Sequence, residues 1–194
     1  IKISEWNRDP QGRIILEKNS GFPTPQDSLA VFGTSNPPYI LGLHTSITYK
    51  GLTLSVLAEG RFGAIINNTI GNALDFTGVS GYSAQAGRQP FVIPNSSYDD
   101  GTGKYVANTN VVTKNGNNNF WASTWNNVGS TYINSADFWK IREVSLSYAL
   151  PSKLLGKSFI KAVSVALVGR NLLTYKSKGN VWTDPEFANT TGNT

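Results

Sequence analysis

Apolar and polar residues alternate along four stretches of the chain, with the period of two that predicts β-strands. The first two stretches, 39–49 and 52–60, are separated only by Lys50 and Gly51. Glycine supplies the left-handed backbone that a tight hairpin turn needs. The other two stretches lie within 138–175 and are joined by the short sequence PSKLLGKSF. The pattern therefore predicts two hairpins.

Each predicted strand has one apolar face and one small or polar face. In the first hairpin the apolar positions are Leu41, Leu43, Thr45, Ile47 and Tyr49, followed by Leu52, Leu54, Val56 and Ala58. In the second hairpin they are Val144, Leu146 and Tyr148, followed by Val163, Val165 and Leu167. Such strands contact two different media, which are core and water in a sandwich, or lipid and lumen in a membrane barrel.

Long connections fall on one side of these hairpins. Residues 1–38, 61–137 and 176–194 are rich in turn-forming residues, with only a weak helical pattern at 64–76. Strands of about ten residues match the roughly 9–11 that cross a membrane at a tilt. Short turns at one end and long loops at the other are typical of outer-membrane barrels. We therefore expect an all-β fold, a transmembrane antiparallel β-barrel with long extracellular loops.

Composition narrows the classes of function further. Charged residues are 15% of the chain, and the formal charge of +5 comes from dispersed Lys and Arg without a basic run, so nucleic acid is a poor candidate partner. The chain has no Met and begins at Ile1, and we expect it to be a piece of a longer protein.

Two motifs carry a family resemblance. The sequence PPYILGLHTSITYKGLTLSVLAEGRFGAIINNT resembles a hairpin of the SusC/RagA-type TonB-dependent transporters, and ADFWKIREVSLSYALP followed by VSVALVGRNLLTYKS resembles their hairpin near the C-terminus. The segment RQPFVIPNS is similar to a loop of the same family. The resemblance covers essentially the whole chain.

This resemblance implies the late strands of a 22-stranded barrel in the outer membrane of Bacteroidetes. It divides the chain into an extracellular loop (1–38), a hairpin (39–60), a second loop (61–137), a hairpin (138–175) and the start of a third loop (176–194), without the plug domain. The family imports oligosaccharides or peptides. Its implied partners are a SusD/RagB-like surface lipoprotein, TonB acting through the missing N-terminal region, the transported substrate and outer-membrane lipid.

Aromatic residues are expected at both edges of the membrane, where amphipathic rings accumulate. With the short turns on the periplasmic side, Tyr49 and Tyr148 lie at the inner interface. Phe62 and Phe138 then lie near the outer interface.

Catalytic and metal chemistry have little support in the sequence. His44 is the single histidine, which leaves no triad of the usual kind, so we expect no enzyme and no cofactor. Glu59 with Arg61, and Glu143 with Arg142, could suggest acid–base pairs, but cross-strand ion pairing or contacts with the plug are the default interpretation of these residues. The loop at Asp9 offers too few carboxylates for a hard cation, and no metal site is expected.

The most plausible ligand contacts are aromatic and amide side chains of the long loops. A flat ring can cover the apolar side of a sugar while amides bind its hydroxyls, and peptides can use the same groups. The candidates are Trp121, Trp125, Asn126, Asn127, Tyr132, Tyr98 and Trp182. The alternative role for these rings is to hold the loop together or to contact the lipoprotein.

A different class of protein remains open. A secreted or surface β-sandwich that binds carbohydrate or mediates adhesion could also show alternating strands. Such a protein would have to cover its apolar strand faces from within the chain, and four good strands are few for that purpose.

Overall fold

The computed structural model describes residues 1–114, 118–156, 159–160 and 162–186, and the chain divides into two compact units. The sheet unit consists of residues 36–64 and 135–180. The loop unit consists of residues 1–35, residues 65–134 and the described residues from Val181 onward. Both units are therefore built from segments that are far apart in the sequence. No helix among the described residues is long and apolar enough to cross a membrane.

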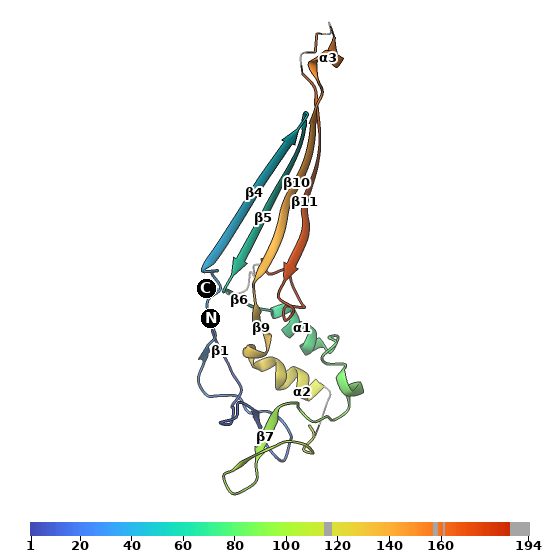
Figure 1. Ribbon diagram of the computed structural model, residues 1–194. Coiled ribbons are helices and arrows are strands. Elements are labelled where there is room, and N and C mark those ends of the chain that lie inside the picture. The colour runs from blue at the N-terminus through green and yellow to red at the C-terminus, as the bar shows by residue number, and fades with distance from the viewer. Residues whose placement is uncertain (115–117, 157–158, 161, 187–194) are drawn as a thin grey trace. The chain divides into compact units, whose positions relative to one another are not determined.

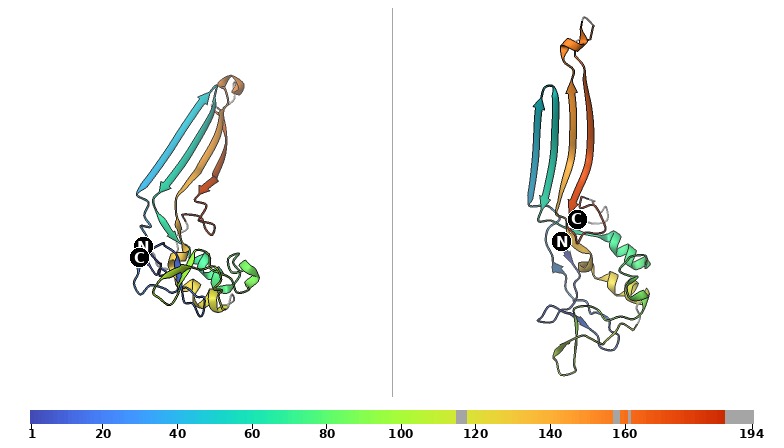
Figure 2. Two further views of the ribbon diagram at one scale, coloured as in Figure 1. Left: turned by 60° about the horizontal axis from the view of Figure 1, so that its bottom comes forward. Right: turned by 45° about the vertical axis from the view of Figure 1, so that its right-hand side comes forward.

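The sheet unit is a four-stranded antiparallel sheet (Figures 1 and 2). Its strands are β4 (Tyr39–Tyr49), β5 (Leu52–Phe62), β10 (Phe138–Ala149) and β11 (Ser164–Lys176), in the order β11-β10-β5-β4. The two hairpins lie side by side because β5 also pairs with β10. The short helix α3 (Ser152–Leu155) lies in the connection between β10 and β11.

The turn of the first hairpin is as tight as the sequence predicts. Lys50 and Gly51 have φ angles of 48° and 84°, the two positive values of a type I′ turn. This turn matches the right-handed twist of the strands it joins, so the pairing continues without interruption from Tyr49 and Leu52 to Tyr39 and Phe62.

The register places the predicted apolar positions on one face of the sheet. Leu54, for example, lies between Ile47 of β4 and Leu146 of β10, which in turn lies opposite Leu167 of β11. Serine and threonine positions line up on the opposite face, where Ser55 lies between Ser46 and Ser145. The predicted separation of apolar and polar faces is therefore confirmed for the described strands.

A bulge in β10 interrupts this alternation once. The register on β5 steps from Ile141 opposite Ala58 to Glu143 opposite Leu57, which leaves Arg142 as an extra residue. An extra residue exchanges the faces of everything beyond it, because side chains alternate with a period of two. The apolar face of β10 therefore uses Tyr148, Leu146 and Val144 on one side of the bulge and Ile141 and Trp139 on the other.

The loop unit has more structure than the sequence predicted. Its strands are β1 (Lys2–Ile3) paired with β3 (Ala30–Val31), β2 (Ile14–Leu16) with β7 (Ser96–Asp99) and β8 (Tyr105–Ala107), and β6 (Ile65–Asn67) with β9 (Ile133–Ser135). Its helices are α1 (Thr69–Thr77), α2 (Asn118–Ser123) and three short 3-10 helices, Gln85–Arg88, Trp125–Asn127 and Gly129–Tyr132. Helix α1 overlaps the weak helical pattern and ends at Gly78, whose φ of 72° allows its N–H to reach the last carbonyls.

Aromatic residues form the core of the loop unit. Phe120 is fully buried and has its ring centre 5.4 Å from that of Phe91 and 5.6 Å from those of Phe22 and Trp125. Leu16 and Ile93 complete the buried cluster. Large rings bury much apolar area each and so hold together three chain segments that have little regular secondary structure.

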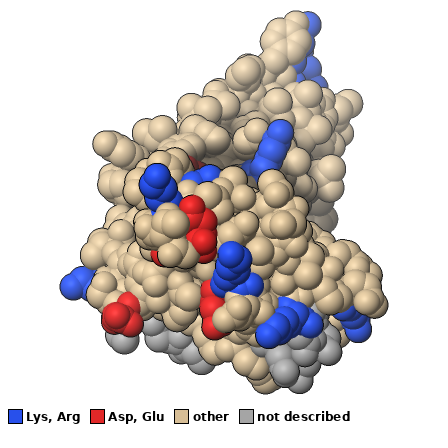
Figure 3. Space-filling view, turned by 90° about the horizontal axis from the view of Figure 1, so that it is seen from below, with Lys and Arg blue, Asp and Glu red and all other residues tan. Residues whose placement is uncertain are grey.

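Charged side chains are dispersed over the surface. On the face shown in Figure 3, Lys and Arg are interspersed with Asp and Glu within a larger uncharged area. The positive charge of the chain therefore forms no continuous basic surface on that face.

Candidate functional site

The apolar face of the sheet is exposed. Leu167 is 75% exposed, Ile47 66% and Leu43 58%, although all three lie within long strands that pair with a neighbouring strand. Leu41, Leu52, Leu54, Leu146, Val165 and Leu173 on the same face are exposed as well. Soluble proteins rarely leave apolar patches of this extent open to water.

Aromatic rings bound this face at both ends. Tyr49 and Tyr148 lie beside Leu52 at the turn end, as the sequence predicts. At the other end lie Tyr39 and Phe62, which face each other, and Trp139 and Tyr175, which also face each other. Between the two ends, β4 is about 33 Å long at about 3.3 Å per residue. At a tilt of about 40° this covers about 25 Å, the height of the apolar band of a membrane barrel.

Phe62 and Trp139 form a contact that the sequence reasoning missed. Their ring centres are 5.5 Å apart in an edge-to-face arrangement. The rings fit because Gly60 lies beneath them, and a Cβ there would come within 2.9 Å of the indole. Trp139 therefore lies beside Phe62 at this end of the apolar face.

Phe138 lies on the opposite face and is only 3% exposed. It faces Arg61 and Lys176 in the register, because the bulge at Arg142 exchanges the faces of the first residues of β10. Unbroken alternation along β10 would place Phe138 on the same face as Tyr148, and the extra residue Arg142 is the reason that it lies on the other face.

Cations surround Phe138 on the polar face. The charged groups of Lys140, Arg61 and Arg142 lie 5.2, 5.8 and 5.8 Å from the ring centre, distances at which a cation is attracted to a ring face. Glu59 accepts hydrogen bonds from Nε of Arg61 at 2.5 Å and from Nε of Arg142 at 2.9 Å. The ring, the carboxylate and the cations together form one polar cluster at this end of the sheet.

The second glutamate of the sheet also pairs across strands. Glu143 accepts a hydrogen bond at 2.9 Å from Nε of Arg170, its register partner on β11, whereas Arg142 binds Glu59. Both glutamates therefore form cross-strand ion pairs, the default interpretation of these residues, and the bulge directs Arg142 toward β5. Farther along the polar face, His44 and Ser55 share a hydrogen bond of 3.0 Å.

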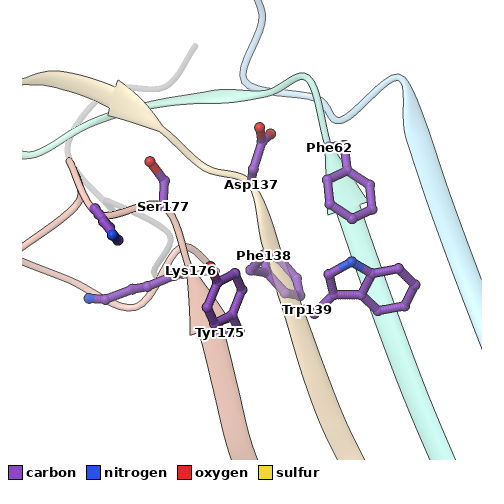
Figure 4. Close-up of a pocket in the computed structure, with 8 residues that line it drawn as sticks. Phe62, Asp137, Phe138, Trp139, Tyr175, Lys176 and Ser177 are labelled. Carbon is purple, nitrogen blue, oxygen red and sulfur yellow. The ribbon is translucent and has the colours of Figure 1, made fainter.

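A pocket of about 370 Å³ lies at the end of β10 and β11 away from the turns. Its lining combines rings and ionisable groups: Phe62, Asp137, Phe138, Trp139, Tyr175, Lys176, Ser177 and Lys178. Figure 4 shows Trp139 beneath Phe62 on one side, Tyr175 and Lys176 on the other, and Asp137 between them. Asp137 accepts a hydrogen bond of 2.7 Å from the backbone N–H of Gly63. The pocket thus joins the aromatic edge of the apolar face to a polar rim.

Three of the candidate ligand contacts belong to the core of the loop unit. Trp121 is 6% exposed and stacks on Phe91, and Trp125 stacks on Trp6 with ring centres 5.5 Å apart. Tyr132 is 2% exposed and donates a hydrogen bond of 2.8 Å to Asp75. These rings hold the unit together, which is the alternative role considered for them.

The amide candidates mainly stabilise the local backbone. Asn127 donates from its side chain to the carbonyl of Ser123 at 2.6 Å, and the carbonyl of Asn126 accepts from the Asn72 side chain at the same distance. The side-chain oxygen of Asn126 is buried without a hydrogen-bond partner.

Two aromatic candidates remain nearer the surface. Tyr98 is half-buried, with the Lys18 ammonium 5.3 Å from its ring centre. Trp182 packs on Gly71 of α1, and its ring centre lies 6.2 Å from that of Tyr82, which is 50% exposed. Tyr82 was not among the predicted residues. The structure does not gather the seven candidates into one surface.

The loop at Asp9 is a closed turn. Asp9 accepts hydrogen bonds from the backbone N–H groups of Gln11 at 3.0 Å and Arg13 at 2.9 Å, and it pairs with Nε of Arg13 at 2.7 Å. Burial alone would raise the pKa of Asp9, but these hydrogen bonds outweigh it and lower the pKa to about 2. Both carboxylate oxygens are thus engaged within the turn.

The other acidic turn is also locally bonded. Asp100 accepts hydrogen bonds from the hydroxyl and the backbone N–H of Thr102, and these bonds lower its pKa. Asp99 accepts from the N–H groups of Gly101 and Gly103. Among the described residues, no group of three or more His, Cys, Asp or Glu side chains could hold a metal ion.

Comparison with known proteins gives matches along most of the chain. No family model matches. The TonB-dependent receptor P3 of Formosa agariphila is 22% identical over 167 residues, which are 86% of this chain and 15% of the receptor. Solved structures of the RagAB peptide importer match 91% of the chain in the open-open state, with a TM-score of 0.57 and 19% identity, and 91% in the closed-closed state, with a TM-score of 0.53 and 16% identity.

The chain spans 19% of each of these two importer chains, so it corresponds to a small part of such a protein. The resemblance to the TonB-dependent, SusC/RagA-like transporters is confirmed, and with it the outer membrane as the expected location. The matched proteins are described as a receptor and as importers, not as enzymes.

Proposed function

We propose that the sheet unit is a section of the wall of an outer-membrane importer, and that its apolar face contacts lipid. The observation that supports this most is the apolar face itself, whose large side chains on β4 and β11 are exposed and which is bounded by aromatic rings at both ends. A membrane is the environment that gives such a face a favourable contact, since its hydrocarbon region is bordered by interfaces that favour Tyr and Trp.

In this proposal the four strands belong to the late part of a 22-stranded closed barrel. β4 and β11 each pair along only one edge within the described residues, and further strands of the longer protein would continue the sheet on both sides. The polar face, with Glu59, Arg61 and His44, then faces the lumen.

The loop division follows from the same topology. All connections between the hairpins and the loop unit leave the sheet at the end opposite the turns. With the turns on the periplasmic side, residues 1–38, 61–137 and those from 176 onward lie on the extracellular side. The described part of the last segment ends at Glu186, and the remainder of that expected loop lies outside the described residues.

The transported substrate is proposed to be an oligosaccharide or a peptide. The RagAB structures are described as a peptide importer, which favours the peptide alternative by analogy. Transport would be energised through TonB by the N-terminal region of the longer protein, and a SusD/RagB-like lipoprotein would cap the extracellular side. Among the candidate ligand contacts, Tyr98, Asn127 and Trp182 remain the proposed ones, with Tyr82 added beside Trp182.

The lipid-facing assignment is tested by two neighbouring substitutions in β10. Val144 lies on the apolar face near mid-strand, and Ser145 lies on the polar face beside it. V144R in the full-length protein is expected to cost about 2–4 kcal/mol, the value for Arg at the middle of the bilayer, whereas S145R should cost much less. The readout is the amount of heat-modifiable barrel in the outer-membrane fraction.

The β-sandwich alternative predicts a different result. In a sandwich, V144R would disrupt the core. The wild-type protein would be recovered soluble and monomeric without detergent, and not in the membrane fraction. Equal loss of assembled barrel in V144R and S145R would also contradict the proposed assignment of the two faces.

A further inference from the structure

We propose that the pocket at the outer end of β10 and β11 binds a membrane lipid with an anionic headgroup. This inference rests on the proposed function, because it takes the apolar face as the lipid-facing side of a barrel. The pocket volume of about 370 Å³ lies within the roughly 300–1,000 Å³ typical of ligand sites.

The apolar half of the site continues the apolar face. Trp139 is 40% exposed and Tyr175 is 70% exposed, and they lie opposite each other in the register. Leu173 lies next on that face, opposite Ile141, and is 59% exposed. An acyl chain running down the sheet from the pocket would therefore contact rings first and aliphatic side chains below them.

The polar half of the site lies one step beyond the rings. β11 runs from the turn toward the outer end, and Lys178, which lines the pocket, follows Tyr175 on the side away from the hydrocarbon. Tyrosine and tryptophan mark the depth at which hydrocarbon gives way to headgroups. The ammonium group of Lys178 is thus proposed to lie at the level of headgroup phosphates, with which Lys pairs as a point charge. Lys176 lies opposite Phe138 on the polar face and is not part of this contact.

The location favours lipid over the transported substrate as the occupant. A sugar or a peptide could also stack on Trp139 and Tyr175, but both rings lie on the face assigned to lipid, whereas a substrate would pass along the polar face. The remaining ionised group in the lining, Asp137, is bound to the N–H of Gly63, so its carboxylate is held by the backbone.

The test measures lipid retention on the full-length transporter in detergent by native mass spectrometry. The probes are palmitoyl-oleoyl phosphatidylglycerol, which is anionic, and the phosphatidylcholine with the same chains, which is zwitterionic. The anionic lipid should bind more tightly. K178Q should weaken it about five-fold, the effect of one lysine near an anionic surface, and Y175A should weaken both lipids.

K153Q is the matched control, because it removes the same charge from an exposed position at the opposite end of the sheet. It should leave both affinities unchanged. Equal retention of the two lipids, or an equal effect of K178Q and K153Q, would overturn the proposal. If inorganic phosphate alone displaced the lipid, and K178Q abolished this displacement, the pocket would be a site for a free anion. That result would reject the proposed lipid site.

Failure of this inference is distinguishable from failure of the proposed function. The same preparations are tested for heat-modifiable barrel in the outer-membrane fraction. A protein that assembles normally but does not discriminate between the two lipids rejects only the lipid site. A protein that is absent from the membrane fraction rejects the wall assignment as well.

Discussion

Single charged residues differ greatly in how firmly they are held in this structure. The Glu59 carboxylate is shared by Arg61 and Arg142, and its side chain is 22% exposed. The Glu143 carboxylate pairs with Arg170, whose side chain is 75% exposed. Solvent weakens the second pair far more than the first, since exposed ion pairs contribute little to stability.

Substituting these two glutamates by glutamine should therefore have unequal effects. E59Q is expected to lower local stability by about 1–2 kcal/mol, since it weakens hydrogen bonds to two guanidinium groups. E143Q should cost less than about 0.5 kcal/mol. Hydrogen exchange of the β5 and β10 amides in detergent measures both, and equal increases in exchange would show that the Glu59 cluster has no special role.

The Asp9 turn predicts a pH dependence at low pH. The pKa of Asp9 is lowered from 3.8 to about 2 in the folded protein, so its stabilising effect is complete above about pH 4 and is lost as the pH falls toward 2. Pepsin cleavage within residues 9–16 should increase over this interval. D9N should be cleaved to a similar extent at about pH 4 and about pH 2. A D9N cleavage profile that matches that of the wild type would show that the Asp9 carboxylate does not stabilise the turn.

At the scale of elements, a buried polar contact ties helix α1 to the 3-10 helix Gly129–Tyr132. Tyr132 donates to Asp75, which also binds the hydroxyl of Ser80, and all three side chains are buried. Burial raises the pKa of Tyr132, and the hydrogen bond to Asp75 raises it further. The phenol therefore stays protonated at pH values where an exposed tyrosine ionises.

Y132F should destabilise the loop unit by about 1–3 kcal/mol, because Asp75 loses one of its buried donors. Y98F, which changes a half-buried tyrosine of the same unit, is the control and should have little effect. Because the pKa of Tyr132 is raised, its contribution is complete below about pH 10 and is lost above it. Protease resistance of the loop unit should thus fall with rising pH in the wild type but much less in Y132F.

The sequence predicted the first hairpin well, since its two strands alternate without interruption from Tyr39 to Phe62 around one tight turn. It does not show on which face of the sheet Phe138 lies, because nothing in the letters near Arg142 indicates an extra residue in β10. The bulge is recognisable only from the partner strands, where Ala58 and Leu57 are consecutive but face Ile141 and Glu143.

The loop unit shows a second limit of the sequence reasoning. Trp121 and Tyr132 lie in an aromatic-rich stretch of the long connection between the hairpins, and they were candidate ligand contacts. Their burial depends on Phe22 and Leu16 from the beginning of the chain and on Ile93 and Asp75 from the middle. Contacts between such distant segments carry no periodic signal, so only the structure could separate core rings from surface rings.

At the scale of the whole molecule, the proposed topology assigns the two turns to the periplasmic side and the long connecting segments to the extracellular side of the outer membrane. The chain has no cysteine, so single cysteines can report on this arrangement. K104C in the exposed β7–β8 loop should react with a membrane-impermeant maleimide on intact cells. K153C in the β10–β11 turn should react only after the outer membrane is permeabilised, in a full-length background without other cysteines.

Reaction of both cysteines on intact cells would contradict the orientation. Reaction of K153C alone would reverse it, and the pocket beside Tyr175 would then lie in the inner leaflet. The comparison uses two exposed lysines, so differences in reactivity report location rather than burial.

The extra residue Arg142 in β10 also affects how this strand can be recognised and transferred. In residues 138–141 the apolar-face positions are odd-numbered, and in residues 143–149 they are even-numbered. A prediction that assumes unbroken alternation therefore finds two short strands in place of β10, each too short to span a bilayer. Opposite the bulge, β11 compensates with two residues of its own, Asn171 and Leu172, where Asn171 has a φ of 50°. Transfer of β10 into another barrel therefore requires this part of β11 as well. Without it, the apolar side chains on one side of the bulge would lie on the opposite face of the sheet.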